Sequence, residues 1–95
     1  MAYQPVDGPN VYGTISVGTT PVELKIGASA LSERKVIVIQ SLGSRIYLGY
    51  DNSVTVSNGM EMSKRQVLFL EVGEHVQVFA VASSGTIDVR IQELS

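Results

Sequence analysis

Few side chains in this sequence could do acid–base chemistry, and they are scattered. The single histidine, His75, stands two residues after Gly73, where the pattern predicts the start of a strand. No GxSxG motif supplies a nucleophile that it could activate, and a general base needs a partner in defined geometry. We therefore expect His75 to be a structural or surface residue.

Metal and carboxylate sites have little more support. One histidine and no cysteine do not make a ligand set, and the calcium-like start DNS at 51–53 is followed by Val54 and Val56 at later ligand positions. Two acids brought together by folding would suit a hydrolase, yet no spacing selects a pair. The acids concerned are Asp7, Glu23, Asp51, Glu61, Glu71 and Asp88. We expect a non-enzymatic protein without catalytic residues, metal or cofactor, and keep the hydrolase as an alternative.

The tyrosines suggest a second alternative, sugar binding, because aromatic faces supply contact area with a polar tip. The chain has no Trp, and Tyr47 and Tyr50 are predicted on opposite faces of one strand. Core packing and rim contacts explain all four tyrosines, Tyr3, Tyr12, Tyr47 and Tyr50, equally well. A glycan-binding module is kept as an alternative, which exposed tyrosines on one face would favour.

Composition sets the class of molecule. The 95 residues, 44% hydrophobic and 17% charged, are typical of one folded domain rather than a disordered chain. A net charge of -2 gives no cationic field to attract nucleic acid or an anionic membrane, so we expect neither partner. The start of the chain has no signal-peptide pattern and no long apolar run follows, so we expect a soluble chain.

The hydrophobic period is two along most of the chain, which predicts β-strands. The segment TIDVRIQEL, 86–94, puts Ile87, Val89 and Ile91 on one face and polar residues on the other. The segment HVQVFAVA, 75–82, is apolar on both faces, which is typical of a central strand. The expected strands lie at 11–17, 22–26, two within 35–50, 66–72, 75–82 and 86–94.

Turn chemistry predicts how these strands pair. Short turns at 73–74 and 83–85 predict an antiparallel meander of the last three strands, with Gly85 at positive φ. The segment 35–50 is predicted to be a hairpin about Gly43, and 27–34 to be a loop or a single turn. The fold class is all-β, a single antiparallel β-sandwich or small barrel of about seven strands. Jelly-roll and immunoglobulin-like topologies both fit this pattern.

Protein contacts are the function that remains. Residues 1–10 have no strand pattern and form either a frayed tail or an extended arm laid on a neighbour, ahead of the sandwich at 11–95. The loop at 50–66 is long for a small domain and predicts a projecting hairpin with a type I′ turn at Asn58–Gly59. Its alternating methionines would close the barrel end or meet a partner. The predicted contact residues are Tyr3, Pro5, Val6, Pro9, Val54, Val56, Asn58, Met60, Met62, Lys64 and Arg65.

The motifs of residues 11–94 also resemble a known class of protein. RIYLGYDNSVTVSNGMEM, followed by two apolar strands and a closing DVRI, is similar to small all-β virion proteins of tailed bacteriophages, as is the earlier VGTTPVE and RKVIVIQSLG. The resemblance implies a capsid decoration or cement protein, commonly a homotrimer, in a virion assembled in the host cytoplasm. It leaves open a neck, tail or fibre-attachment position, and it carries over no binding residue.

Overall fold

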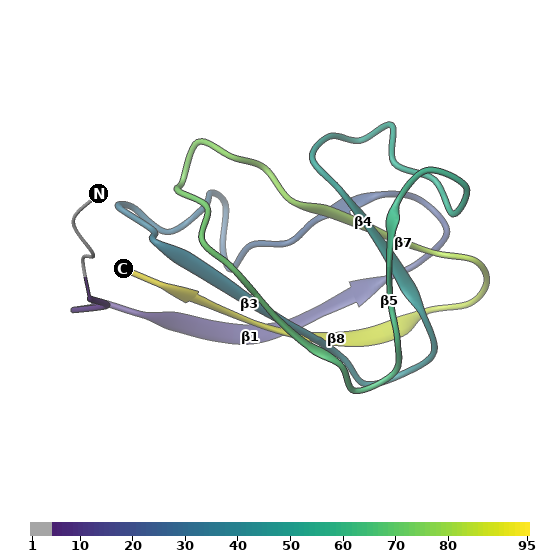
Figure 1. The fold of residues 1–95 in the computed structure, drawn as a ribbon, viewed down its shortest axis with the longest axis horizontal. Helices are drawn as coiled ribbons and strands as arrows, with labels where there is room; N and C mark the ends of the chain where they lie inside the picture. Colours follow the sequence, from purple (N-terminus) through teal and green to yellow (C-terminus); the bar gives the residue numbers. More distant parts are fainter. Residues whose placement is uncertain (1–4) are drawn as a thin grey trace.

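The computed structural model describes residues 5–95, and within them the chain forms eight β-strands and no helix (Figure 1). The all-β class predicted from the period of two is confirmed, with eight strands in place of about seven. The strands are β1 (Val11–Val17), β2 (Val22–Glu23), β3 (Val36–Ser41), β4 (Ile46–Gly49), β5 (Met60–Met62), β6 (Val67–Leu70), β7 (Phe79–Ala82) and β8 (Ile87–Leu94).

The strands form two four-stranded antiparallel sheets. Sheet A has the order β1-β8-β3-β6, and sheet B has the order β2-β7-β4-β5. Strand β1 pairs with β8, β2 with β7, β3 with β6 and β4 with β5, as in one long hairpin that has been rolled up from its tip at the β4–β5 loop. This is the jelly-roll order, which decides between the two topologies that the sequence left open.

The predicted pairing of strands that follow one another in sequence is wrong in most places. The last three strands form no meander, because β6 and β8 lie in sheet A and β7 lies in sheet B. Residues 35–50 form no hairpin, since β3 and β4 lie in different sheets. Gly85 has the predicted positive φ, 66°, but its turn carries the chain from one sheet to the other. Among the described strands, only β4 and β5 are neighbours in both sequence and sheet.

The core lies between the sheets and uses the inner positions of each strand. Strand β8 alternates between buried and exposed residues from Ile87 to Glu93, as the sequence pattern predicted. Strand β7 is central in sheet B, again as predicted. Burying one Ile or Val side chain stabilises the fold by about 1.5–3 kcal/mol. The most deeply buried hydrophobic residues include Val17, Leu24, Ile37, Ile39, Ile46, Met62, Val78, Ala80, Val89 and Ile91.

The predicted projecting arm is also wrong, because the β4–β5 loop packs against its own sheet. Val54 is buried, and a Cβ on Gly59 would lie 2.8 Å from both Val54 Cγ2 and Tyr47 Cβ. Neither Asn58 nor Gly59 has positive φ, so there is no type I′ turn here. Glycine is needed at 59 for this close approach, and the second half of the supposed arm is β5, an edge strand of sheet B.

A buried ion pair ties two long loops to β8. The Glu93 carboxylate accepts a hydrogen bond from Arg34 Nη1 at 2.8 Å and others from two backbone amides, those of Ile26 and Leu31. The Arg34 guanidinium also donates to three carbonyl oxygens, those of Val72, Gly73 and Val76. Both side chains are almost wholly buried. The pair therefore fixes the β2–β3 and β6–β7 loops at one end of the sandwich.

Candidate functional site

The N-terminal segment, in the part that the structure describes, lies against the chain's own C-terminus. The amides of residues 7 and 8 donate to the Ser95 carbonyl oxygen at 2.6 and 2.7 Å. The Ser95 hydroxyl donates to the Pro9 carbonyl oxygen at 2.5 Å. Of the predicted contact residues here, Tyr3 lies outside the described residues, and the exposed ones are Pro5, Val6 and Pro9. Contact between this segment and another chain stays a prediction.

The predicted contact residues of the β4–β5 loop have three different environments. Val54 is 5% exposed and belongs to the packing of the loop. Asn58 is exposed, but its side-chain oxygen accepts a hydrogen bond from the Thr55 amide at 2.7 Å and so closes the loop. Val56 is exposed and has an apolar side chain that a partner could cover.

Met60 and Met62 lie on one side of β5, as predicted, but that side is the inner face of sheet B. Met62, opposite Ile46, is 1% exposed, whereas Met60, opposite Leu48, is 54% exposed. The difference arises because the sandwich is open between β5 and β6, the outermost strands of the two sheets on this side.

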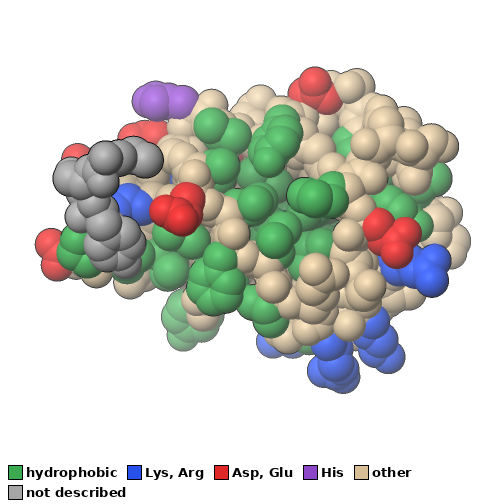
Figure 2. All heavy atoms as spheres, viewed as in Figure 1, with side chains coloured by type: hydrophobic (Ala, Val, Ile, Leu, Met, Phe, Trp, Pro, Cys, Tyr) green, Lys and Arg blue, Asp and Glu red, His purple; other side chains and the backbone are tan. Residues whose placement is uncertain are grey.

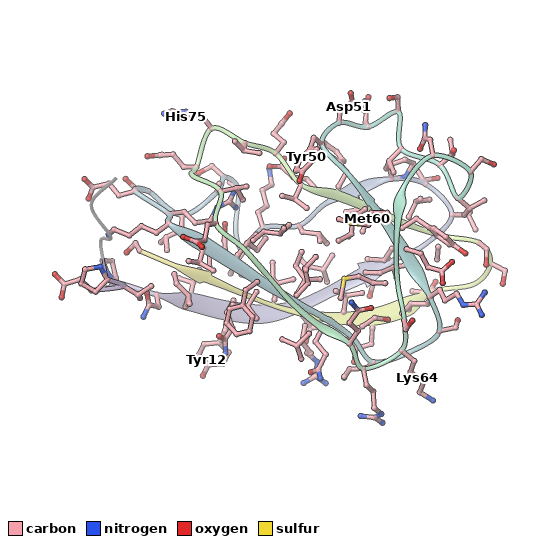
Figure 3. All side chains as sticks on the ribbon, in the orientation of Figure 1. Tyr12, Tyr50, Asp51, Met60, Lys64 and His75 are labelled. Atoms are coloured by element: carbon pink, nitrogen blue, oxygen red, sulfur yellow. The ribbon has the colours of Figure 1, made fainter. Side chains whose placement is uncertain are left out.

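An apolar slot of about 250 Å³ lies at this open side. Figure 2 shows hydrophobic side chains gathered at the centre of the face, and Figure 3 labels Tyr50 and Met60 there. The lining residues are Leu48, Gly49, Tyr50, Asn58, Met60, Leu70 and Val78. Packing of the sandwich accounts for part of this lining, since Leu48 and Val78 belong to the buried core and Leu70 packs against it.

Lys64 and Arg65 form the turn between β5 and β6 and are both exposed, and Figure 3 labels Lys64 there. Arg65 has φ of 64°, and its amide donates to the Ser41 carbonyl oxygen at 2.7 Å, which fixes the backbone of the turn. Neither side chain takes part in an ion pair with any carboxylate within residues 5–95. Both cations therefore point into solvent beside the first residue of β6.

The most exposed aromatic side chains lie on the outer face of sheet A, which the sequence analysis did not select. Register places Tyr12, Gln92, Val38 and Phe69 in one row across the four strands. Tyr12 is 81% exposed and Phe69 is 66% exposed. Tyr12 points away from the sandwich in Figure 3. The alternation of side chains along the strand could have identified this face. Phe69 lies between two leucines that face the core, so its own ring must face outwards.

Polar residues surround the Tyr12 end of this row. A shallow groove of about 370 Å³ runs beside the tyrosine ring. Arg90 ion-pairs with Asp88 at 3.2 Å on the same face. The groove is lined by Tyr12, Gly13, Thr14, Gln40, Arg90, Ile91 and Gln92. The outer face of sheet A therefore has aromatic and aliphatic anchors with hydrogen-bonding groups around them.

Asp51 and His75, two titratable residues considered for chemistry, both lie in exposed loops. His75 is exposed in the β6–β7 loop (Figure 3). Hydrogen bonds from Ser53, the side-chain one first, hold the pKa of the exposed Asp51 carboxyl below its ordinary value. Within residues 5–95, no three His, Cys, Asp or Glu side chains are grouped where they could hold a metal ion. The same residues contain no helix long and apolar enough to cross a membrane.

Comparison with protein-family models, with curated proteins and with solved structures finds no match to this chain. The jelly-roll order by itself is shared by proteins of unrelated function, so it does not select one. What distinguishes this molecule is where its exposed apolar groups lie. We therefore infer its function from the outer face of sheet A and from the strand edges.

Proposed function

We propose that the protein is a non-enzymatic structural component of a phage virion, namely a capsid decoration protein that stabilises the head by binding capsid subunits. The proposal joins the resemblance of residues 11–94 to small virion proteins with the exposed aromatic side chains of Tyr12 and Phe69 on the outer face of sheet A. The protein would be incorporated into the virion during assembly in the host cytoplasm.

The row of Tyr12, Gln92, Val38 and Phe69, with its two exposed aromatic side chains, is the observation that carries the proposal. Outward positions of a sandwich strand are usually polar, and large apolar groups that gather on a surface mark a binding site. Tyrosine and other aromatic residues are enriched at protein interfaces, where a polar rim surrounds them. The charged and amide side chains of β8 and β3 supply such a rim.

A broad sheet face suits a shell surface better than it suits a small molecule. A decoration protein stabilises by mass action, because it binds the assembled shell and not the dissociated subunits. Such binding depends on contact area and on a few buried anchors rather than on reactive groups. The outer face of sheet A offers both anchors and area without a deep cleft.

The test is co-sedimentation of the purified protein with empty heads of the phage whose genome encodes it. We expect saturable binding at high copy number, and we expect Tyr12→Lys to weaken it by at least about thirtyfold, since aromatic anchors at an interface contribute 2 kcal/mol or more. Ser84→Lys, at an exposed position in the β7–β8 turn, is the matched control. Wild-type protein that stays in the supernatant would overturn the proposal, as would equal binding by the two variants.

The same co-sedimentation experiment, extended to complete particles and isolated tails, tests the position of the protein in the virion. A neck, tail or fibre-attachment component would leave empty heads unbound and co-purify with complete particles at low copy number. Binding to isolated tails in place of heads would therefore support this alternative and contradict decoration.

Glycan binding is a second candidate because of the groove beside Tyr12. An exposed ring next to Gln40, Arg90 and Gln92 could stack on a sugar and bond its hydroxyl groups. The described tyrosines do not share a face, however: Tyr47 lies in β4 of sheet B, and Tyr50 lines the slot. Saturable binding to purified host-surface polysaccharide, lost in Tyr12→Ala, would favour this candidate over capsid binding.

A further inference from the structure

We propose that two copies of this chain associate through their β6 strands, which pair antiparallel about Leu68 to join two A sheets into one eight-stranded sheet. In this arrangement a two-fold axis stands perpendicular to the joined sheet. The pairing stands independently of capsid binding, since it needs no other protein. It differs from the trimer that the resemblance implies.

Strand β6 is the least protected edge of the sandwich. It is the last strand of sheet A, so one of its sides has no strand beside it. All four of its residues are apolar, and it has none of the charge, proline or bulge that usually blocks pairing at an edge. Val67 and Phe69 face outwards and are exposed, while Leu68 and Leu70 face the core and are only half-buried. A neighbouring strand would cover part of the surface of all four of these side chains.

The other three edges are less suited to pairing. β2 has two residues, which is too short for a stable ladder. β5 has three, with an exposed charged residue, Glu61, in the middle. β1 is longer, but its outward positions after Tyr12 are polar, at Thr14 and Ser16. Short or charged edges of this kind resist association.

The charges on either side of β6 favour a second copy of this chain as the partner and an antiparallel pairing of the two strands. The segment KRQVLFLE, 64–71, begins with two cations and ends with an acid. Antiparallel pairing about Leu68 places Arg65 of each copy opposite Glu71 of the other, and Val67 opposite Phe69. Parallel pairing would place like charges side by side, which is destabilising. Lys64, Arg65 and Glu71 are all exposed, and none takes part in an ion pair within residues 5–95.

The dimer would present two binding faces in the same direction. A two-fold axis perpendicular to a sheet keeps the outer face of both halves on the same side, because only the strand direction is reversed. Val67 and Phe69 of the two copies would then form one apolar cluster at the centre. The Tyr12 side chains would lie toward the two far edges, since β1 is the opposite end of sheet A.

Sedimentation velocity over a concentration series tests the dimer without any capsid. We expect a reversible dimer, which Phe69→Lys converts to a monomer by raising the dissociation constant about a hundredfold or more, since each interface holds two copies of the residue. Tyr12→Lys is the matched control, because it adds the same charge at an exposed aromatic position of the opposite edge strand. Circular dichroism checks that both variants fold.

Charge exchange tests the direction of pairing. Arg65→Glu and Glu71→Lys should each weaken the dimer about tenfold, because each puts like charges opposite one another, and the double variant should restore it. Glutamate tolerates the positive φ of position 65, since Glu33 has φ of 59° in this chain. Failure of the double variant to recover would overturn antiparallel pairing through β6.

Cysteine cross-linking tests the register, and the chain has no cysteine of its own to interfere. Residues opposite one another in an antiparallel pair have Cα atoms about 4.5–5.5 Å apart, within disulfide range. A single cysteine at 68 should give a cross-linked dimer on oxidation, because Leu68 lies opposite itself, and so should an equal mixture of the Val67→Cys and Phe69→Cys proteins. Neither of those two variants alone, nor Thr14→Cys, should cross-link, since their cysteines are not opposite one another. A monomer at every concentration, a trimer, or a dimer that survives Phe69→Lys would overturn the proposal. Capsid binding by such a protein would still support the proposed function.

Discussion

At the scale of single residues, the buried Arg34–Glu93 pair gives a direct test of how burial changes the contribution of an ion pair to stability. Removing Arg34 leaves the buried Glu93 carboxylate with only its two backbone-amide hydrogen bonds, and breaking a buried pair in this way costs about 3–5 kcal/mol. We therefore expect Arg34→Met to lower the free energy of unfolding by about that amount in urea denaturation. Since Arg34 also bonds three loop carbonyl oxygens, the change would loosen the β6–β7 loop as well.

The matched control for this prediction is Arg90→Met. Arg90 makes the same kind of ion pair with Asp88, at 3.2 Å, but both side chains are about half exposed. Exposed pairs contribute about 0–1 kcal/mol, so this variant should unfold at nearly the wild-type urea concentration. If both substitutions lowered the free energy of unfolding equally, burial of the Arg34–Glu93 pair would not govern its contribution to stability.

At the scale of elements, β5 offers a comparison between two identical side chains. Met62 is buried in the core and Met60 is largely exposed at the slot, although the two residues face the same side of one short strand. Met62→Ala should cost about 2–5 kcal/mol, whereas Met60→Ala should cost less than about 1 kcal/mol. Thermal and urea unfolding of both variants measure the difference in stability. Equal losses would contradict the burial of Met62 and the exposure of Met60.

Strand pattern and strand pairing differ in how far the sequence predicts them. Alternation is local, so the inner positions of β8 and the central place of β7 follow from short segments. Pairing in a jelly roll is not local: β1 meets β8, and β3 lies between β6 and β8. A turn with glycine looks the same whether it joins neighbours in one sheet or crosses between sheets, which explains why Gly85 was predicted correctly and its hairpin was not.

The predicted interface residues also depend on contacts between segments that are far apart in the sequence. Val54 and Met62 are predicted contacts because the loop pattern predicts a projecting hairpin. In the structure Val54 packs near Gly49 and Gly59, Met62 lies opposite Ile46, and both side chains are buried. Tyr12 and Phe69, which share a row on sheet A, stand at opposite ends of the strand order and far apart in sequence. No local motif could place them together, because their relation depends on the register of four strands.

At the scale of the whole molecule, hydrogen bonds connect the two ends of the described chain. They distinguish two possible roles of the N-terminal segment, one in stability and one in contact with a neighbouring subunit. The amides of residues 7 and 8 and the Pro9 carbonyl group bond to Ser95, whereas Pro5 and Val6 precede these bonds and are exposed. Removing residues 1–6 should therefore leave the melting temperature unchanged. Removing 1–10 deletes these three hydrogen bonds and a fourth, from the Ser95 amide to Asn10 Oδ1 at 3.0 Å, and should cost about 2–6 kcal/mol, since each contributes about 0.5–1.5 kcal/mol.

The shorter truncation is consequently the one that tests whether the segment is an arm. If residues 1–6 contact a neighbouring subunit, the truncated protein should melt like the wild type and yet bind empty heads more weakly in co-sedimentation, with a several-fold higher concentration at half saturation. Unchanged binding would limit the contact surface to the sandwich, with Tyr12 and Phe69 as its anchors. The 1–10 truncation cannot make this distinction, because a loss of binding there would follow equally from loss of the bonds to Ser95.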